Sequence, residues 1–173
     1  MKTGLIIVGI LFALVGLAGL VLYLLGRSLP ERHRMATTVR LGASREVVWD
    51  VITDYARIPE WWPAVKSSRV ETRPDGEMLT WNTDGRGQKM AFHTKEEHRP
   101  ARLVREIVGD QLAFGGTWTF ELSQDGTGTQ LTLTEDGFIR PPFFRAVAQY
   151  FIGLDRTQKD FLAHLERRVA AEK

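Results

Sequence analysis

The sequence predicts an α+β fold, in which a C-terminal helix covers an antiparallel β-sheet and a separate membrane-spanning helix comes first. Three observations predict it. Residues 5–25 form an uncharged apolar run, residues 65–135 alternate with period two between turn residues, and residues 143–170 repeat apolar side chains at helical spacing. We therefore expect a membrane anchor and basic linker at residues 1–34, and one folded domain with its own core at residues 35–173.

The N-terminal apolar run, Leu5 to Leu25, is long enough to cross a bilayer. Its 21 residues reach roughly 31 Å as a helix, close to the roughly 30 Å of a hydrocarbon core. A cleaved signal peptide and a buried core helix are the alternatives. A signal peptide has a shorter apolar region and small residues at its cleavage site, whereas this run ends in the bulky residues "VLYLLGR". The sequence therefore favours a membrane span.

The flanks of this run predict its orientation. Lys2 precedes it, whereas Arg27, Arg32 and Arg34 follow it, with only Glu31 opposing them. Positively charged flanks stay on the cytoplasmic side of a membrane. We therefore expect a single-pass protein whose C-terminal domain is cytoplasmic.

Charge and cysteine content exclude several classes of function. The chain has 23 basic and 21 acidic residues, and its first 34 positions hold four of the basic residues but only one acid. The remaining domain is close to neutral, so the sequence predicts no nucleic-acid partner. Because the chain has no cysteine, disulfides, thiolate metal sites and a cysteine nucleophile are excluded.

Local patterns predict the first elements of the domain. Residues Met35–Leu41 alternate and include β-branched side chains, which is typical of a strand. Ser44 is a suitable N-cap for a short helix that ends near Asp54. Pro59 and Pro63 then bracket a second short helix, because proline is tolerated at a helix start and disfavours its continuation.

After Val65 the chain reads as an antiparallel meander of strands. Short turns separate its apolar runs, and Asp-Gly pairs tolerate the positive φ angles that tight hairpins require. These pairs are Asp75-Gly76, Asp84-Gly85 and Asp125-Gly126.

The alternation gives the sheet one apolar and one polar face. Trp118 and Phe120 share one face of their strand, and Leu133 shares a face with Glu135. A sheet of this kind needs a cover on its apolar side. We expect that cover to be one amphipathic helix from Phe143 to Ala170, with a kink at Gly153.

Three segments resemble the SRPBCC superfamily, which is also called the START-like or birch-pollen-allergen-like superfamily. They are "ASREVVWDVITDYARIPEWWPAVKSSRVE", "GTWTFELSQDGTGTQLTLTEDG" and "DRTQKDFLAHLERRV". Within the superfamily the chain looks most like the polyketide cyclase/dehydrase and lipid transport branch, over residues 36 to 170; the apolar run lies outside the pattern. The resemblance implies a helix-grip fold: a curved antiparallel sheet wrapped around a long C-terminal helix, with two short helices after the first strand and an elongated cavity between.

The resemblance also implies where a ligand would bind. We expect one indole of the pair Trp61 and Trp62 to pack under the sheet and the other to lie at the cavity rim. The expected lining combines the inward positions of the strands and of the C-terminal helix: Trp81, Phe92, Trp118, Phe120, Leu133, Phe151 and Leu154.

Few residues offer catalytic chemistry. The four histidines show no metal-ligand spacing, no serine lies in a nucleophile turn, and the glycine-rich segments lie between strands rather than before a helix. We therefore expect no metal and no cofactor. The remaining candidates are inward acids, Glu135, Glu106 and Asp155, since a carboxylate in an apolar cavity can act as an acid or base. The alternative is that each acid reaches the rim or pairs with an arginine.

Three functions are consistent with this sequence. The first is a membrane-tethered module that binds or transports a hydrophobic molecule such as a lipid, an isoprenoid or a polyketide. The second is a cyclase or dehydratase that uses a cavity carboxylate, and the third is a scaffold whose cavity has collapsed. The volume and lining of the cavity distinguish the three: an inward carboxylate favours the enzyme, an apolar lining the carrier, and a filled interior the scaffold.

Overall fold

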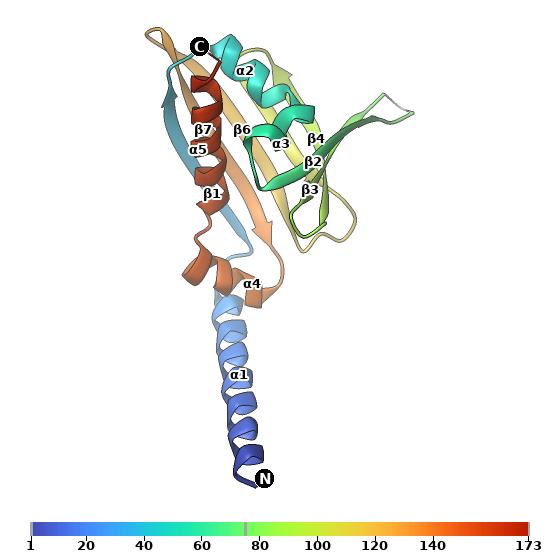
Figure 1. Cartoon of the computed structure of the whole chain (residues 1–173), viewed down its shortest axis with the longest axis vertical. Helices are drawn as coiled ribbons and strands as arrows, with labels where there is room; N and C mark the ends of the chain where they lie inside the picture. Colours follow the sequence, from blue (N-terminus) through green and yellow to red (C-terminus); the bar gives the residue numbers. More distant parts are fainter. Residues whose placement is uncertain (1, 75, 173) are drawn as a thin grey trace.

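A long helix carries a domain built on one seven-stranded sheet (Figure 1). The computed structural model describes residues 2–74 and 76–172. The elements are, in order, α1 (Lys2–Ser28), β1 (Arg32–Leu41), α2 (Arg45–Thr53), η1 (Tyr55–Arg57), α3 (Ile58–Trp61), β2 (Val65–Thr72), β3 (Met78–Asp84), β4 (Lys89–His98), β5 (Arg102–Val108), β6 (Phe114–Asp125), β7 (Gly128–Ile139), α4 (Pro142–Val147), η2 (Ala148–Ile152) and α5 (Arg156–Ala170).

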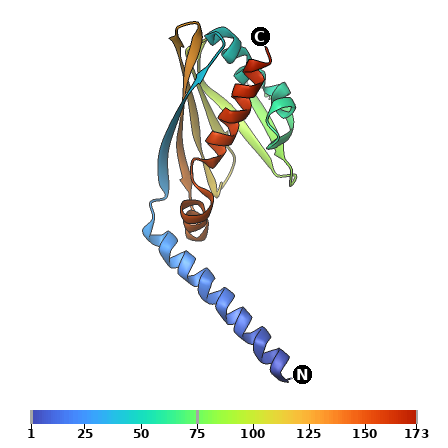
Figure 2. The same ribbon diagram turned by 60° about the vertical axis from the view of Figure 1, so that its left-hand side comes forward.

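Helix α1 extends away from the domain (Figures 1 and 2). Its apolar side chains are exposed along almost the whole helix, and among the described residues it is the one helix long and apolar enough to cross a membrane. Strand β1 begins at Arg32, only three residues after Leu29. Part of the segment expected to be a basic linker is therefore the first strand of the sheet.

The sheet is antiparallel and follows the predicted meander. Its strand order is β1-β7-β6-β5-β4-β3-β2, so the first strand pairs with the last. Of the three predicted hairpin turns, two place a glycine at positive φ: Gly76 at 87° and Gly126 at 61°. Asp75 lies outside the described residues. In the third turn the positive φ of 80° belongs to Gly87, and Asp84 caps the turn by accepting from two backbone amides.

The core lies between the concave face of the sheet and helix α5 (Figure 2). Leu131, Leu133 and Leu165 are fully buried there, and Trp49 of α2 is 1% exposed. Ser44 caps α2 as predicted, since its hydroxyl accepts a hydrogen bond from the amide of Val47. The curved sheet, the two short helical pieces after β1 and the C-terminal helix form the helix-grip arrangement expected from the sequence.

The predicted 28-residue C-terminal helix is wrong in one respect. The structure divides residues 142–170 into α4, the π-helical segment η2 and α5, with the break at Gly153. Gly153 has a φ of 86°, a left-handed conformation that ends η2 and redirects the chain. Only α5 covers the sheet. The residues before the break turn outward, so Phe151 is 72% exposed rather than buried.

Candidate functional site

A cavity of about 300 Å³ lies beside the core, between the sheet, the start of α5 and the segment from α2 to α3. Phe114 and Thr157 line it and are exposed, so the cavity reaches the surface at the end of the domain near α1. Its wall is mainly apolar and aromatic, as is usual for sites that bind small organic molecules. The apolar lining residues are Ile52, Ile58, Trp62, Met90, Phe92, Ile107, Phe114, Trp118, Phe120 and Phe161.

One wall of the cavity carries a buried cation. Arg105 of β5 is 9% exposed, and its guanidinium lies 3.8 Å from the centre of the Tyr55 ring. Its Nε and Nη1 atoms have no hydrogen-bond partner among the described residues, and the same holds for Oδ1 of Asn82, also in this wall. Burial lowers the pKa of Arg105, and the neighbouring Tyr55 offsets this in part. A strong donor and an acceptor thus lie in the wall without partners.

The same face of the sheet carries Glu135 of β7, and Trp118 of β6 lies between it and Arg105 in the strand register. Trp118 Nε1 donates to one carboxylate oxygen at 2.9 Å, and His33 Nε2 lies 3.2 Å from the other. The side chains of His33 and Glu135 are 15% and 20% exposed. Gly137 makes room for the imidazole, because a Cβ there would lie 2.5 Å from Nε2. Both oxygens of this carboxylate are therefore engaged by side chains of the wall.

Several sequence-predicted residues lie in the cavity wall. Phe92, Trp118, Phe120 and Glu135 all line it. Leu133 points to the same side of the sheet but is fully buried in the core. These five share the inward parity that the alternation predicts.

Three predicted lining residues lie elsewhere. Trp81 pairs with Ala91 and neighbours Asn82, which lines the cavity; because strand residues alternate, Trp81 points to the opposite face. Phe151 and Leu154 precede α5 and do not line the cavity: Phe151 is exposed just before the break at Gly153, and Leu154 is half-buried just after it. Both residues were predicted to point inward because the C-terminal helix was predicted to be continuous.

Two of the three candidate acids lie outside the cavity. Glu106 does share a face with Val104 and Val108, as the sequence suggests, but that face is the outer one, and its carboxylate lies 3.5 Å from Lys95. Val104 is buried on that outer side, which made the parity misleading. Asp155 pairs with Lys159 at the start of α5. Glu135 is the candidate acid that lines the cavity.

The two neighbouring indoles have different roles. Trp61 is 9% exposed and packs edge to face on Phe161, with ring centres 5.3 Å apart. Trp62 lines the cavity and stacks near Trp118, while its Nε1 donates to Asp160 of α5 at 2.8 Å. As expected, one indole belongs to the core and the other to the cavity rim.

Arg105 was not among the lining residues predicted from the sequence. In "LVREIV" it shares the parity of Leu103 and Ile107, so the alternation already placed a cation on the inward face. Asn82 alternates with Trp81 in the same way, and the assignment of Trp81 to the inside excluded it. The signal for both polar groups was the parity of strands β3 and β5.

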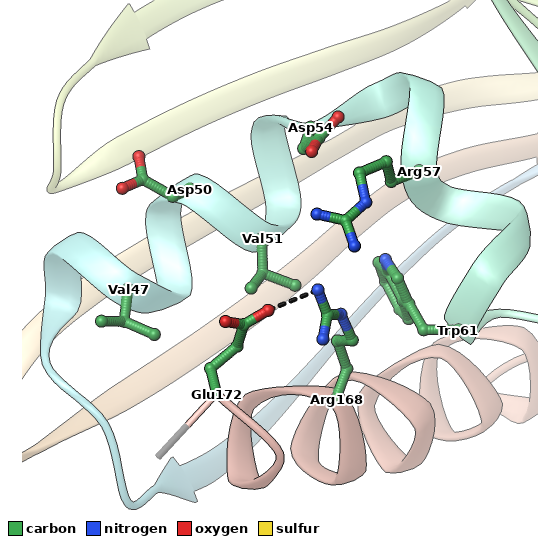
Figure 3. A pocket seen from close by; sticks show the side chains of 8 residues that line it. All are labelled: Val47, Asp50, Val51, Asp54, Arg57, Trp61, Arg168 and Glu172. Atoms are coloured by element: carbon green, nitrogen blue, oxygen red, sulfur yellow. Dashed lines mark ion pairs between the residues drawn. The ribbon is translucent and has the colours of Figure 1, made fainter.

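A second pocket of about 270 Å³ lies at the other end of the domain, between α2 and α5 (Figure 3). Four of its five charged side chains form ion pairs on the surface: Arg57 with Glu60 at 2.9 Å, Asp50 with Arg99 at 2.8 Å, and Arg168 with Glu172. The described residues contain no cluster of three His, Asp or Glu side chains that could hold a metal ion. Neither feature offers the unpartnered groups found in the larger cavity.

Comparisons with known proteins agree with the fold. Residues 41–161 match the family described as polyketide cyclase / dehydrase and lipid transport. No curated protein sequence matches the chain.

Solved structures share the architecture at low sequence identity. The di-domain ARO/CYC protein BexL of the BE-7585A biosynthetic pathway aligns with a TM-score of 0.64 and 14% identity, over 83% of this chain and 52% of that one. A START superfamily protein from Mycobacterium smegmatis aligns at 0.63 and 19%, over 82% and 99%. A protein from Rhizobium leguminosarum aligns at 0.61 and 18%, over 82% and 96%. This chain spans about half the length of BexL, and these likenesses show the fold.

Proposed function

Because the chain belongs to the polyketide cyclase/dehydrase and lipid transport family, we propose that it binds a hydrophobic molecule that ends in an acidic group and that α1 tethers it to a membrane. The observation that carries this proposal is the apolar cavity of about 300 Å³ with a buried arginine in its wall, two nitrogens of which have no hydrogen-bond partner among the described residues. An open cavity of this size leaves the hypothesis of a collapsed scaffold without a structural basis.

The polar groups of the cavity specify one end of the ligand. A buried donor without a partner costs about 1–3 kcal/mol, and Arg105 leaves two such nitrogens in the wall. A carboxylate or phenolate oxygen matches a guanidinium in charge and geometry. A protonated acid or a neighbouring hydroxyl would satisfy Oδ1 of Asn82. The aromatic wall would then hold the apolar body of the ligand.

Helix α1 supports the second part of the proposal. It is uncharged from Leu5 to Leu25, its apolar side chains have no cover in the domain, and the basic residues that follow it favour a cytoplasmic domain. A tether of this kind would keep the cavity where lipids, isoprenoids and other apolar metabolites are concentrated.

Native mass spectrometry of the full chain released from detergent micelles tests the ligand class. The probes are dodecanoic acid and its methyl ester, which differ in the acidic group. We expect the chain to bind the acid roughly thirtyfold more tightly than the ester, because a buried charge pair contributes about 2 kcal/mol or more. The Arg105→Met variant should bind the ester with unchanged affinity and should no longer bind the acid more tightly than the ester.

Arg102→Met is the matched control. Arg102 lies on the same strand as Arg105, but it faces outward and pairs with Glu96 and Glu121 at 2.9 and 2.7 Å. Its replacement should leave both affinities unchanged. Failure of the wild-type chain to bind either probe would contradict the cavity as a ligand site, whereas equal binding of acid and ester would contradict only the role of Arg105.

A second candidate function is a cyclase or dehydratase, and the observation that favours it is the carboxylate of Glu135 in the cavity wall. Such a reaction requires a group that gives or takes a proton at the substrate. Glu135→Gln preserves the shape and the hydrogen bond from Trp118 while it removes the charge. With a synthetic poly-β-ketone thioester as substrate, an enzyme would form an aromatic product whose rate falls at least a hundredfold in this variant. The binding function predicts no product with either chain.

A further inference from the structure

Five exposed apolar side chains lie together on α4 and η2, between the sheet and α5. We call them the aromatic rim: Phe143, Phe144, Tyr150, Phe151 and Ile152, which are 38%, 58%, 55%, 72% and 51% exposed. Apart from α1, the other exposed large apolar residues among those described are Val70 and Met78, on neighbouring strands β2 and β3, and Phe114. A soluble surface rarely keeps a contiguous patch of this kind without a partner.

The aromatic rim is fixed to the end of α1 (Figures 1 and 2). Gly26 lacks a side chain, and a Cβ there would lie 1.7 Å from the carbonyl oxygen of Pro142, so the two backbones are in direct contact. Arg145 Nε donates to the carbonyl of Gly26 at 3.0 Å, and its Nη1 lies 3.9 Å from Glu31. This side chain is only 12% exposed. These contacts hold α4 at the point where the apolar run of α1 ends.

We infer that the aromatic rim inserts into the interfacial layer of the bilayer that α1 crosses. The inference rests on the proposed function, in which α1 spans the membrane. Because the apolar run ends at Leu25 and the rim is held against Gly26, the rim lies at the level of the lipid headgroups. Aromatic side chains are favoured at that level. The exposed apolar surface therefore continues from the span onto α4 and η2 without interruption.

The charged residues near the aromatic rim also favour a lipid bilayer as its partner. Arg27 lies in the last turn of α1, Arg32 begins β1 and Arg156 begins α5, and none of the three forms an ion pair among the described residues, whereas Arg34 and Arg140 pair with Asp136 and Glu31. Basic side chains beside an apolar surface attract anionic headgroups. A protein partner would need a complementary acidic border, whereas a bilayer supplies both the apolar and the anionic component.

This placement directs the mouth of the cavity toward the bilayer. Phe114 pairs with Ile139, three residues before α4, and the amide of Arg140 donates to the carbonyl of Ala113 at 2.8 Å. Thr157 lies in the first turn of α5, just after η2. The exposed lining residues, Phe114 and Thr157, are thus at the rim end of the domain. A lipophilic ligand would enter from the membrane surface without crossing bulk water.

Site-directed spin labelling of the full chain in phospholipid vesicles tests this, and the absence of native cysteine makes single labels possible. Labels go to Phe151→Cys and Phe144→Cys in the rim, with Ser123→Cys near the β6–β7 hairpin as the distant control and Leu14→Cys in the middle of α1. Each label is read for its accessibility to oxygen, which concentrates in lipid, and to a water-soluble nickel chelate. We expect the label at Leu14 to be open to oxygen and closed to nickel, the label at Ser123 to be open to nickel, and the rim labels to lie between these two, as the headgroup level requires.

The outcomes separate the inference from its premise. If the label at Leu14 is open to nickel, α1 does not span the bilayer and the membrane tether fails together with the rim. If the label at Leu14 lies in lipid but the rim labels are as open to nickel as the label at Ser123, only the inference is overturned. Rim labels shielded from both reagents would indicate a second protein copy or another partner, which also overturns it.

Discussion

The interface between the sheet and α5 has a packed half and a hollow half, although one alternating pattern builds both. In the packed half, Leu131 and Leu133 of β7 meet Leu165 of α5 and are fully buried. In the hollow half, the same face of the sheet presents Glu135 on β7 and Arg105 on β5 to a cavity of about 300 Å³. Alternation along a strand thus determines which side chains point toward the interior. The helix that faces them determines whether they pack closely.

The difference between the halves begins at Gly153. With a φ of 86° it ends η2, and α5 resumes only at Arg156, so the rim end of the sheet has no helix along it. The residues that an unbroken helix would have brought inward, including Phe151, instead lie on the surface. One glycine conformation therefore accounts for both the cavity and the aromatic rim.

The largest effect is expected when one apolar side chain in each half is truncated to alanine and the losses of stability are compared. Leu133→Ala in the packed half should lower the free energy of unfolding by about 3 kcal/mol, because a fully buried leucine leaves a cavity that does not collapse. Ile107→Ala in the hollow half should cost about 1 kcal/mol, since its side chain already borders open space. Chemical denaturation in detergent micelles measures both. Equal losses would show that the cavity is closed in solution.

The second test concerns the helix break. Gly153→Ala should lower the free energy of unfolding by about 1–2 kcal/mol, because an alanine at positive φ is strained. Gly85→Ala is the control: its φ lies outside the left-handed region, and an added Cβ would make only ordinary contact with Lys66. We expect the free energy of unfolding of that variant to lie within about 0.5 kcal/mol of the wild-type value. If Gly153→Ala is equally neutral, the break does not require this conformation.

The residues explain why the sequence predicted the inward side chains of β6 and β7 well and those of β3 and β5 poorly. Alternation in β6 and β7 correctly placed Trp118, Phe120 and Leu133 inward, since a strand's period follows from local geometry alone. The same reading took Trp81 and Glu106 to be inward. The outer face also buries apolar residues such as Val104, so the alternation of apolar and polar side chains does not distinguish the inner face from the outer one there.

The C-terminal helix shows a second limit of sequence reading. Residues Phe143–Ala170 have continuous helical spacing, and one glycine inside such a pattern is usually tolerated at about 1 kcal/mol. The segment before the break packs against α1, where Gly26 meets Pro142, a contact between residues more than a hundred positions apart. Local periodicity carries no information on such a contact. Phe151 and Leu154 were therefore assigned to the wrong surface.

The third test removes the cation from the hollow half. Arg105→Met should raise the free energy of unfolding of the ligand-free chain by about 1 kcal/mol, since two unpartnered buried donors cost more than the stacking on Tyr55 contributes. Burial lowers the pKa of Arg105, so the folded state disfavours the charged form at every pH below that pKa, neutral pH included. Arg102→Met should instead destabilise slightly, because it loses two ion pairs. Destabilisation by both variants would mean that Arg105 has a partner in solution.

The prediction with the smallest expected effect compares the buried Arg105 with Arg57, an arginine exposed to solvent. Arg57 lies on the surface with its guanidinium 2.9 Å from Glu60; this hydrogen bond and the attraction of the carboxylate raise the pKa of Arg57 and lower the pKa of Glu60. Because the pKa of Glu60 is lower in the folded state, the pair stabilises the fold above 4.5, the ordinary pKa of the carboxyl, and this contribution is lost as the pH falls through the folded-state pKa. Glu60→Gln should therefore shift the urea midpoint slightly at neutral pH and not at all at the acid end. A shift that persists in acid would show that the side chain acts through packing rather than charge.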